Sequence, residues 1–183
     1  MPNTSVGKLL KEKKKAKENL SKKLFFSRKS PILALFLDNE LSKDEEQKMK
    51  TFLDGVSSLD VIVVALADSN LETLRLPNVV ILPYDRLNRK ELLAASDMAL
   101  CFPFSDVEEM IINGVIPISS VRPGIADYNP NCETGNSFIY KKEDPWHIFA
   151  ALVRARETFK FPYDWAHIVR QGLCSICGRK SLN

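Results

Sequence analysis

Short apolar runs, each long enough for one strand, most constrain the fold of this chain. The first three lie at residues 32–37, 61–66 and 79–82, and two more strands are expected at 97–102 and 115–118. Runs of this length are typical of parallel strands that are buried on both faces. Segments with helical spacing separate them. The sequence therefore predicts an α/β domain with a parallel sheet and helices on both faces, and a small strand at 137–140 brings the sheet to about five to six strands.

Helix start signals support this alternation. Ser42 is followed three residues later by Glu45, which is the pattern of a capping box. Asp144 precedes Pro145, and an acidic N-cap before a proline is a favourable helix start. Further helices are expected at 89–95, 106–112 and 163–171.

Basic residues are concentrated at the N-terminus. Residues 1–29 hold ten Lys or Arg and two Glu, whereas the whole chain of 183 residues carries a net charge of +3. Apolar residues recur among these lysines at roughly helical spacing, which predicts a basic helix or linker over 1–29. The same charge suits a polyanion-binding arm. Because aromatic side chains are not interleaved with the lysines, we do not expect nucleic acid as a partner.

The remaining sequence divides into one domain over 30–171 and a tail over 172–183. The tail contains Cys174-Ser175-Ile176-Cys177, which is half of a zinc knuckle, but a second pair at suitable spacing is missing. We therefore expect an exposed tail, no metal and no cofactor. No run of about 18 apolar residues exists, so we expect no membrane-spanning segment, and we expect no membrane among the partners. The polar N-terminus and the pattern of four cysteines predict a cytoplasmic protein.

The candidate site lies in the loops that follow the strands, because open parallel sheets bind ligands beyond the carboxyl ends of their strands. In the loop 121–127, Gly124 would let the backbone approach a phosphate, and Arg122 would add charge. Tyr84, after the third strand, would lie against a base. The same residues also fit a plain strand-to-helix turn and a packed aromatic side chain.

Four segments in order carry a family resemblance. They are Ser96-Asp97-Met98-Ala99-Leu100, Asn113-Gly114-Val115-Ile116-Pro117-Ile118, Pro123-Gly124-Ile125-Ala126-Asp127 and Thr134-Gly135-Asn136-Ser137-Phe138. Their order and spacing resemble the C-terminal domain of the starch and glycogen synthases, within the GT-B glycosyltransferases. The resemblance covers about residues 14–160. It implies a single Rossmann-like domain of the GT-B C-terminal type.

The resemblance also implies roles for particular residues. Glu109 matches a glutamate that holds the nucleotide ribose, although it would equally favour the positive end of its own short helix. Lys43 matches a lysine that grips the donor phosphates, and Gly124 and Ile125 match the phosphate-binding loop. The chain departs from the family pattern at Asp38 in place of an arginine and at Pro123 in place of a first glycine, and its segment 102–107 is about five residues shorter by spacing.

The activity implied by the resemblance is retaining transfer of glucose from a nucleotide sugar, such as ADP-glucose, to an α-1,4-glucan. The family's first domain supplies the acid/base histidine, and we predict no catalytic residue in this chain. Two interpretations stay open. In the first, the chain is half of a split enzyme and pairs with a separate N-terminal-domain polypeptide. In the second, it is a catalytically inactive binding or interaction module with an eroded pocket, and its basic helix would bind polyanions.

Overall fold

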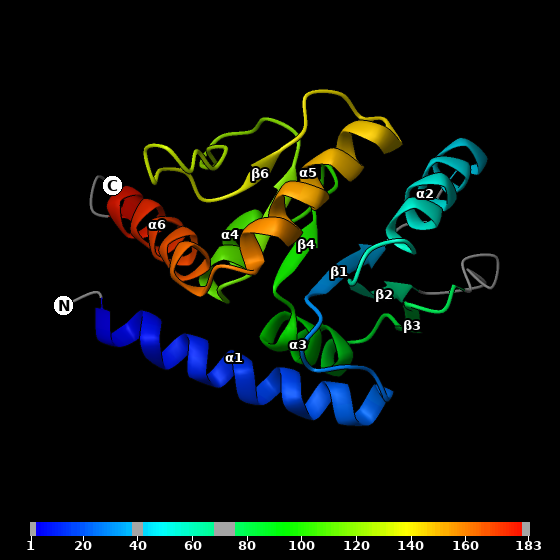
Figure 1. Ribbon diagram of the computed structural model, residues 1–183, viewed down its shortest axis with the longest axis horizontal. Helices are drawn as coiled ribbons and strands as arrows, with labels where there is room; N and C mark the ends of the chain where they lie inside the picture. The colour runs from blue at the N-terminus through cyan, green and yellow to red at the C-terminus, as the bar shows by residue number, and fades with distance from the viewer. Residues whose placement is uncertain (1–2, 38–41, 68–75, 181–183) are drawn as a thin grey trace.

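The computed structural model describes residues 3–37, 42–67 and 76–180. Six strands form one parallel sheet in the order β3-β2-β1-β4-β5-β6 (Figure 1). The strands are β1 (Ile32–Leu37), β2 (Ile62–Ala67), β3 (Val79–Pro83), β4 (Met98–Leu100), β5 (Ile116–Ser119) and β6 (Phe138–Ile139). The predicted α/β class, the parallel sheet and the strand positions are therefore confirmed.

The chain reverses its direction across the sheet between β1 and β4. From β1 the first crossovers lead outward to β2 and β3, and the chain then returns to place β4 on the other side of β1. β1 pairs with β2 along Ile32–Leu37 and with β4 along Leu33–Leu35. A crevice is expected beyond the carboxyl ends of two strands at such a reversal.

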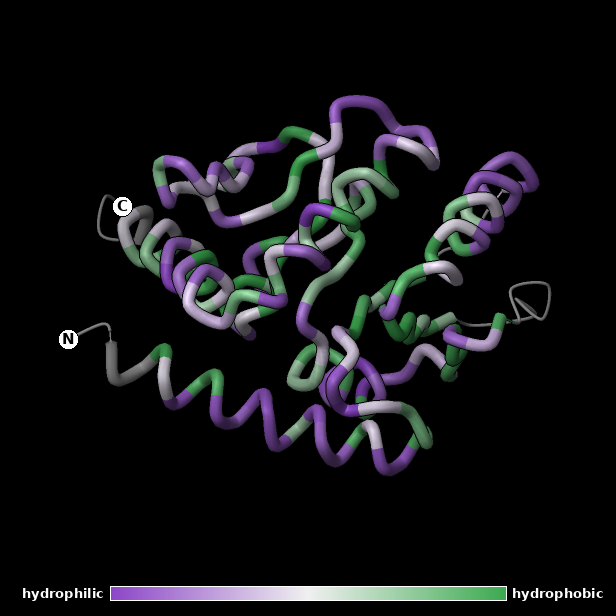
Figure 2. Tube along the Cα trace, viewed as in Figure 1, coloured by the Kyte–Doolittle hydropathy of each residue, from purple (hydrophilic) through white to green (hydrophobic). Residues whose placement is uncertain are grey.

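Alternate residues of each strand face two separate cores. On one face, Leu33, Leu35 and their neighbours in β2 pack against α2 (Lys43–Val56), α5 (Pro145–Phe159) and α6 (Pro162–Lys180). On the other face, Ala34 and Phe36 pack with side chains of α1 (Asn3–Leu24), α3 (Arg86–Ala95) and α4 (Val107–Ile112). The strands are mostly green in Figure 2, as expected for a sheet that is covered on both faces.

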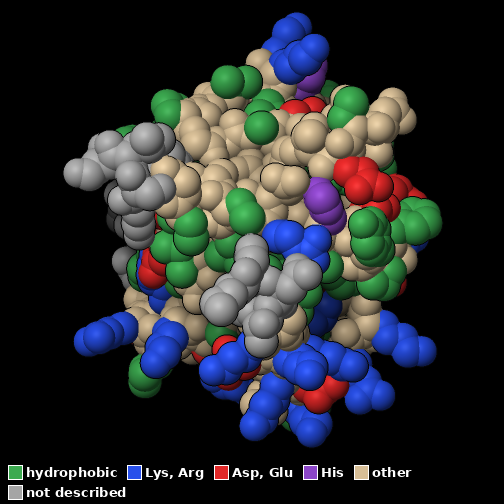
Figure 3. Space-filling model, turned by 90° about the vertical axis from the view of Figure 1, so that its left-hand side faces the viewer, with side chains coloured by type: hydrophobic (Ala, Val, Ile, Leu, Met, Phe, Trp, Pro, Cys, Tyr) green, Lys and Arg blue, Asp and Glu red, His purple; other side chains and the backbone are tan. Residues whose placement is uncertain are grey.

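Two lysines fix helix α1 to the rest of the fold. The side chains of Lys13 and Lys17 are buried, while most of the other lysines of α1 gather on the outside, along the lower edge of the molecule in Figure 3. The Lys13 ammonium donates to the carbonyls of Leu93 (3.3 Å) and Asn113 (3.0 Å), at the C-terminal ends of α3 and α4. Carbonyls at helix C-termini favour a cation. The basic segment is therefore a helix that packs on α3 and α6.

The start signals of α2 and α5 act as predicted. Ser42 and Glu45 form the capping box of α2, and Asp144 accepts hydrogen bonds from the first turn of α5. The last helix extends beyond its predicted end at residue 171 and continues through both cysteines to Lys180. Ile176 is buried, which gives this extension an apolar contact with the domain. Among the helices of the described ranges, none combines the length and apolarity needed to cross a bilayer.

Candidate functional site

Residues that could bind a ligand form three groups near the carboxyl edge of the sheet, and residues predicted from the sequence belong to the first two. The groups are a charged cluster beside the end of β1, the loop after β5, and a cavity between α2 and α5. The loop that follows β1 contains Asp38, which lies outside the described residues.

The charged cluster is built on the first turn of α4. Asp106 caps this helix and accepts a hydrogen bond from the backbone N–H of Glu109 at 2.9 Å. The Glu109 carboxylate accepts hydrogen bonds from both terminal nitrogens of Arg89. Nη1 lies 2.8 Å from Oε1, and Nη2 contacts Oε2. Each side chain is about one-third exposed. The hydrogen bonds that Arg89 donates to Glu109 raise the pKa of Arg89 above its usual value.

Tyr84 and Phe36 complete this cluster. The Arg89 guanidinium carbon lies 5.8 Å from the centre of the Phe36 ring, near the end of β1. Tyr84 also stabilises the charged guanidinium and raises the pKa of Arg89 further. Two predicted site residues, Tyr84 and Glu109, are thus brought together by Arg89. Sequence reasoning missed Arg89, although its place in the first turn of a helix after a parallel strand was a usable signal.

The second group is the loop after β5, which contains three predicted residues. Arg122 donates to the carbonyl of Phe102 at 3.0 Å and reaches the Ser105 carbonyl at 3.5 Å. The guanidinium group of Arg122 therefore connects the loop after β5 to the loop after β4 by hydrogen bonds. Gly124 adopts a left-handed φ of 86°, and its carbonyl accepts from Asn136 Nδ2 at 3.2 Å. Ile125 is half-buried in the same loop.

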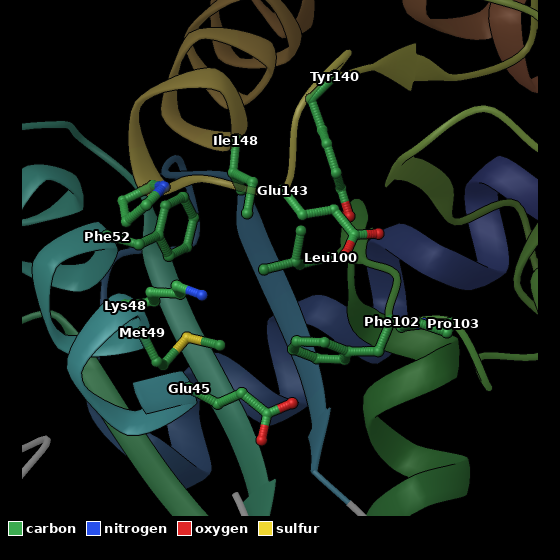
Figure 4. Close-up of a pocket in the computed structure, with 11 residues that line it drawn as sticks. Glu45, Lys48, Met49, Phe52, Leu100, Phe102, Pro103, Tyr140, Glu143 and Ile148 are labelled. Atoms are coloured by element: carbon green, nitrogen blue, oxygen red, sulfur yellow. The ribbon is translucent and has the colours of Figure 1, made fainter. Parts of the chain in front are cut away.

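The third group surrounds a cavity of about 210 Å³ between α2, α5 and the end of β4 (Figure 4). Its rim carries Glu45, Lys48 and Glu143, and the hydroxyl of Tyr140 donates to the Cys101 carbonyl at 3.3 Å. The remaining wall is mostly apolar and comes from Met49, Phe52, Leu100, Phe102, Pro103, Pro145 and Ile148. Sequence reasoning proposed none of these residues, because the cavity forms only when α2 and α5 pack together.

Lys43 is the exposed first residue of α2, beside this cavity but not part of its wall. The chain thus groups Tyr84 with Glu109, and Arg122 with Gly124 and Ile125, while Lys43 stands at a separate helix start. In the described part of the chain, no three His, Cys, Asp or Glu side chains gather as metal ligands. Cys174 and Cys177 are exposed on α6, and neither forms a disulfide.

Comparisons with known proteins connect this geometry to a fold. No family model matches the chain. A segment of 64 residues is 33% identical to the glycogen synthase of Gloeobacter violaceus, and it covers 33% of this chain and 14% of that protein. The structure of Anabaena HepE, in complex with UDP and glucose, superposes with a TM-score of 0.62 at 14% identity, over 86% of this chain and 46% of that one.

A third relative shows which part of such proteins the chain matches. The C-terminal domain of the group 1 glycosyl transferase LpcC from Francisella tularensis has a TM-score of 0.58 at 11% identity, with 84% of this chain and 89% of that domain covered. The chain therefore has the fold of the C-terminal domain of GT-B glycosyltransferases. The predicted resemblance to the glycogen and starch synthases is confirmed, and this GT-B domain spans less than half of HepE.

Proposed function

We propose that this GT-B domain binds a nucleotide-activated sugar at the carboxyl edge of its sheet. The observation that carries the proposal is the meeting of Glu109, Arg89 and Tyr84 beside the end of β1, next to the reversal of strand order. Its structural relative HepE is in complex with UDP and glucose. The match to glycogen synthases favours a glucosyl donor such as ADP-glucose and an α-1,4-glucan as the acceptor.

Different residues of the site would bind different parts of the donor. Glu109 accepts hydrogen bonds from the ribose hydroxyls with the oxygen lone pairs that Arg89 leaves free. Tyr84 lies against the base. Lys43 and the N-terminal end of α2 attract the diphosphate. Gly124 and Ile125 bring backbone close to it, while Arg122 holds the loop 102–105 in position.

Transfer of the sugar also requires an acid/base group and a second wall of the cleft, and we do not assign these to this domain. We assign no catalytic residue here, and we propose that a separate N-terminal-domain polypeptide provides the acid/base group and the other wall of the cleft. The alternative is a binding module that keeps the donor site without transfer. A cytoplasmic location suits both interpretations, because four cysteines that form no disulfide fit a reducing compartment.

Calorimetric titration of the full chain with ADP-glucose, UDP-glucose and ADP tests the donor site. We expect saturable binding of at least one of them, weakened about tenfold or more by Glu109→Gln, since hydrogen bonds to a charged group contribute roughly 1.5–3 kcal/mol. Glu91→Gln is the matched control, because Glu91 pairs with Lys23 on another surface. Absence of binding to all three ligands, or equal affinities of the two variants, would overturn the proposal.

A further inference from the structure

The outer face of α1 presents a row of cations. Lys8, Lys11, Lys15 and Lys22 are spaced by three, four and seven residues, which places them on one side of the helix. All four are exposed, whereas Val6, Lys13, Lys17 and Leu20 on the opposite side are buried. Figure 3 shows basic side chains projecting together from this edge. The lysines of α1 thus fall into an inner set that packs and an outer set that faces solvent.

Most of the outer cations have no carboxylate partner in the part of the chain that the structure describes. Lys8 reaches Glu12 at 3.9 Å, and Lys23, beside the row, pairs with Glu91 at 2.7 Å. Within residues 3–37, 42–67 and 76–180, no ion pair engages Lys11, Lys15 or Lys22. These charges are therefore available to an anionic surface outside the chain.

The row is held on a fixed surface. The inner lysines bind the ends of α3 and α4 and the carboxylate of Asp97, so α1 cannot turn without breaking buried contacts. A helix of 22 residues, at 1.5 Å per residue, extends over roughly 33 Å. The cations from Lys8 to Lys22 lie along about 21 Å of this helix, which suits an extended surface better than a small ligand.

An exposed aromatic residue follows the row. Phe25 is 95% exposed at the turn after α1 and has a left-handed φ of 57°. It lines a shallow groove with Lys22 and Arg28. Moving an exposed phenylalanine from water into the boundary between lipid headgroups and acyl chains is favourable, because it removes apolar surface from water. Single-stranded nucleic acid would instead favour several aromatics along the row, and Phe25 stands only at its end.

We propose that the outer face of α1 docks on an anionic lipid bilayer, with Lys11, Lys15 and Lys22 at the headgroups and Phe25 inserted at the interface. The helix lies on the membrane and does not cross it. Each basic residue near an anionic leaflet strengthens binding about fivefold. Removing three of them should weaken binding about a hundredfold. This docking is independent of the nucleotide-sugar site, which faces the carboxyl edge of the sheet.

Sedimentation of the full chain with vesicles tests the proposal. We expect binding to an equal mixture of phosphatidylserine and phosphatidylcholine, and none to phosphatidylcholine alone. The triple variant Lys11→Gln, Lys15→Gln, Lys22→Gln should lose binding about a hundredfold, and Phe25→Ser about tenfold. Circular dichroism checks that each variant is folded.

The matched control is Lys50→Gln, Lys141→Gln, Lys142→Gln, which removes the same charge from exposed positions outside α1. This control should keep the binding of the unmodified protein. Three results would overturn the proposal: no sedimentation with the anionic vesicles, equal losses in the two triple variants, or tight binding to a random single-stranded RNA without binding to vesicles.

Discussion

The Nζ atom of Lys17 lies 2.6 Å from Oδ2 of Asp97 and joins helix α1 to the start of β4. The same carboxylate oxygen accepts the backbone N–H of Ile32 at 2.8 Å, at the start of β1. The Lys17 and Asp97 side chains are only 10% and 13% exposed. One carboxylate thus connects the first helix with two central strands of the sheet, and the basic segment is anchored by its charge as well as by its apolar residues.

Asp97→Asn should destabilise the protein by about 3–5 kcal/mol, because it leaves the Lys17 ammonium buried without a counter-charge. Urea denaturation measures the loss. The double variant Lys17→Met with Asp97→Asn should recover part of it. Glu91→Gln breaks the exposed pair with Lys23 and should cost less than about 1 kcal/mol. Similar costs for Asp97→Asn and Glu91→Gln would contradict the structural role of the buried pair.

Because of Lys13, the free energy of unfolding should increase with pH between about pH 8 and pH 10.5. Burial lowers the pKa of Lys13 from 10.5 to about 8 in the folded protein. Between these two pH values the unfolded chain binds one more proton, so the contribution of this group to stability increases by about 1 kcal/mol per pH unit. Urea denaturation should show that Lys13→Met reduces the rise from pH 8 to 10.5. Parallel stability curves for the variant and the unmodified protein would contradict this effect.

The strands and helix starts could be predicted from sequence because their signals are local. The six-residue run Ile32–Leu37 and the capping box of Ser42 and Glu45 need no distant partner, and both lie where they were expected. The burial of Lys17 could not be predicted in this way. Its partner Asp97 is 80 residues away, and a lysine in a basic helix is ordinarily exposed.

The candidate site was predictable only in part, because it too depends on residues that are distant in the sequence. Tyr84 and Glu109 were identified by their places after strands and by the family resemblance. Both interact with Arg89, which comes from a different helix from Glu109 and lies 20 residues before it. The wall of the cavity forms from the packing of α2 on α5 and has no sequence signature of its own.

The thiol of Cys101 should be unreactive in the native protein. It is fully buried, and burial raises its pKa to about 12, so the reactive thiolate is scarce at neutral pH. Cys132, Cys174 and Cys177 are exposed. A chromogenic disulfide reagent should therefore titrate three thiols in the native state and a fourth in urea. Cys101→Ala should remove only the fourth thiol, and four equal rates in the native protein would contradict this expectation.

Gly135 should tolerate no side chain, whereas Gly7 should accept one. A Cβ atom on Gly135 would lie 2.3 Å from the backbone carbonyl oxygen of Asp127, and its φ of 106° disfavours other residues. Gly135→Ala should therefore cost about 2 kcal/mol or more.

Gly7 lies inside α1 with no atom within 4 Å of an added Cβ. Gly7→Ala should stabilise the protein by up to about 1 kcal/mol, because alanine has the higher helix propensity. Thermal unfolding of the two variants compares these effects directly, and a loss of stability in Gly7→Ala equal to that in Gly135→Ala would show that the turn at Gly135 is not specifically constrained.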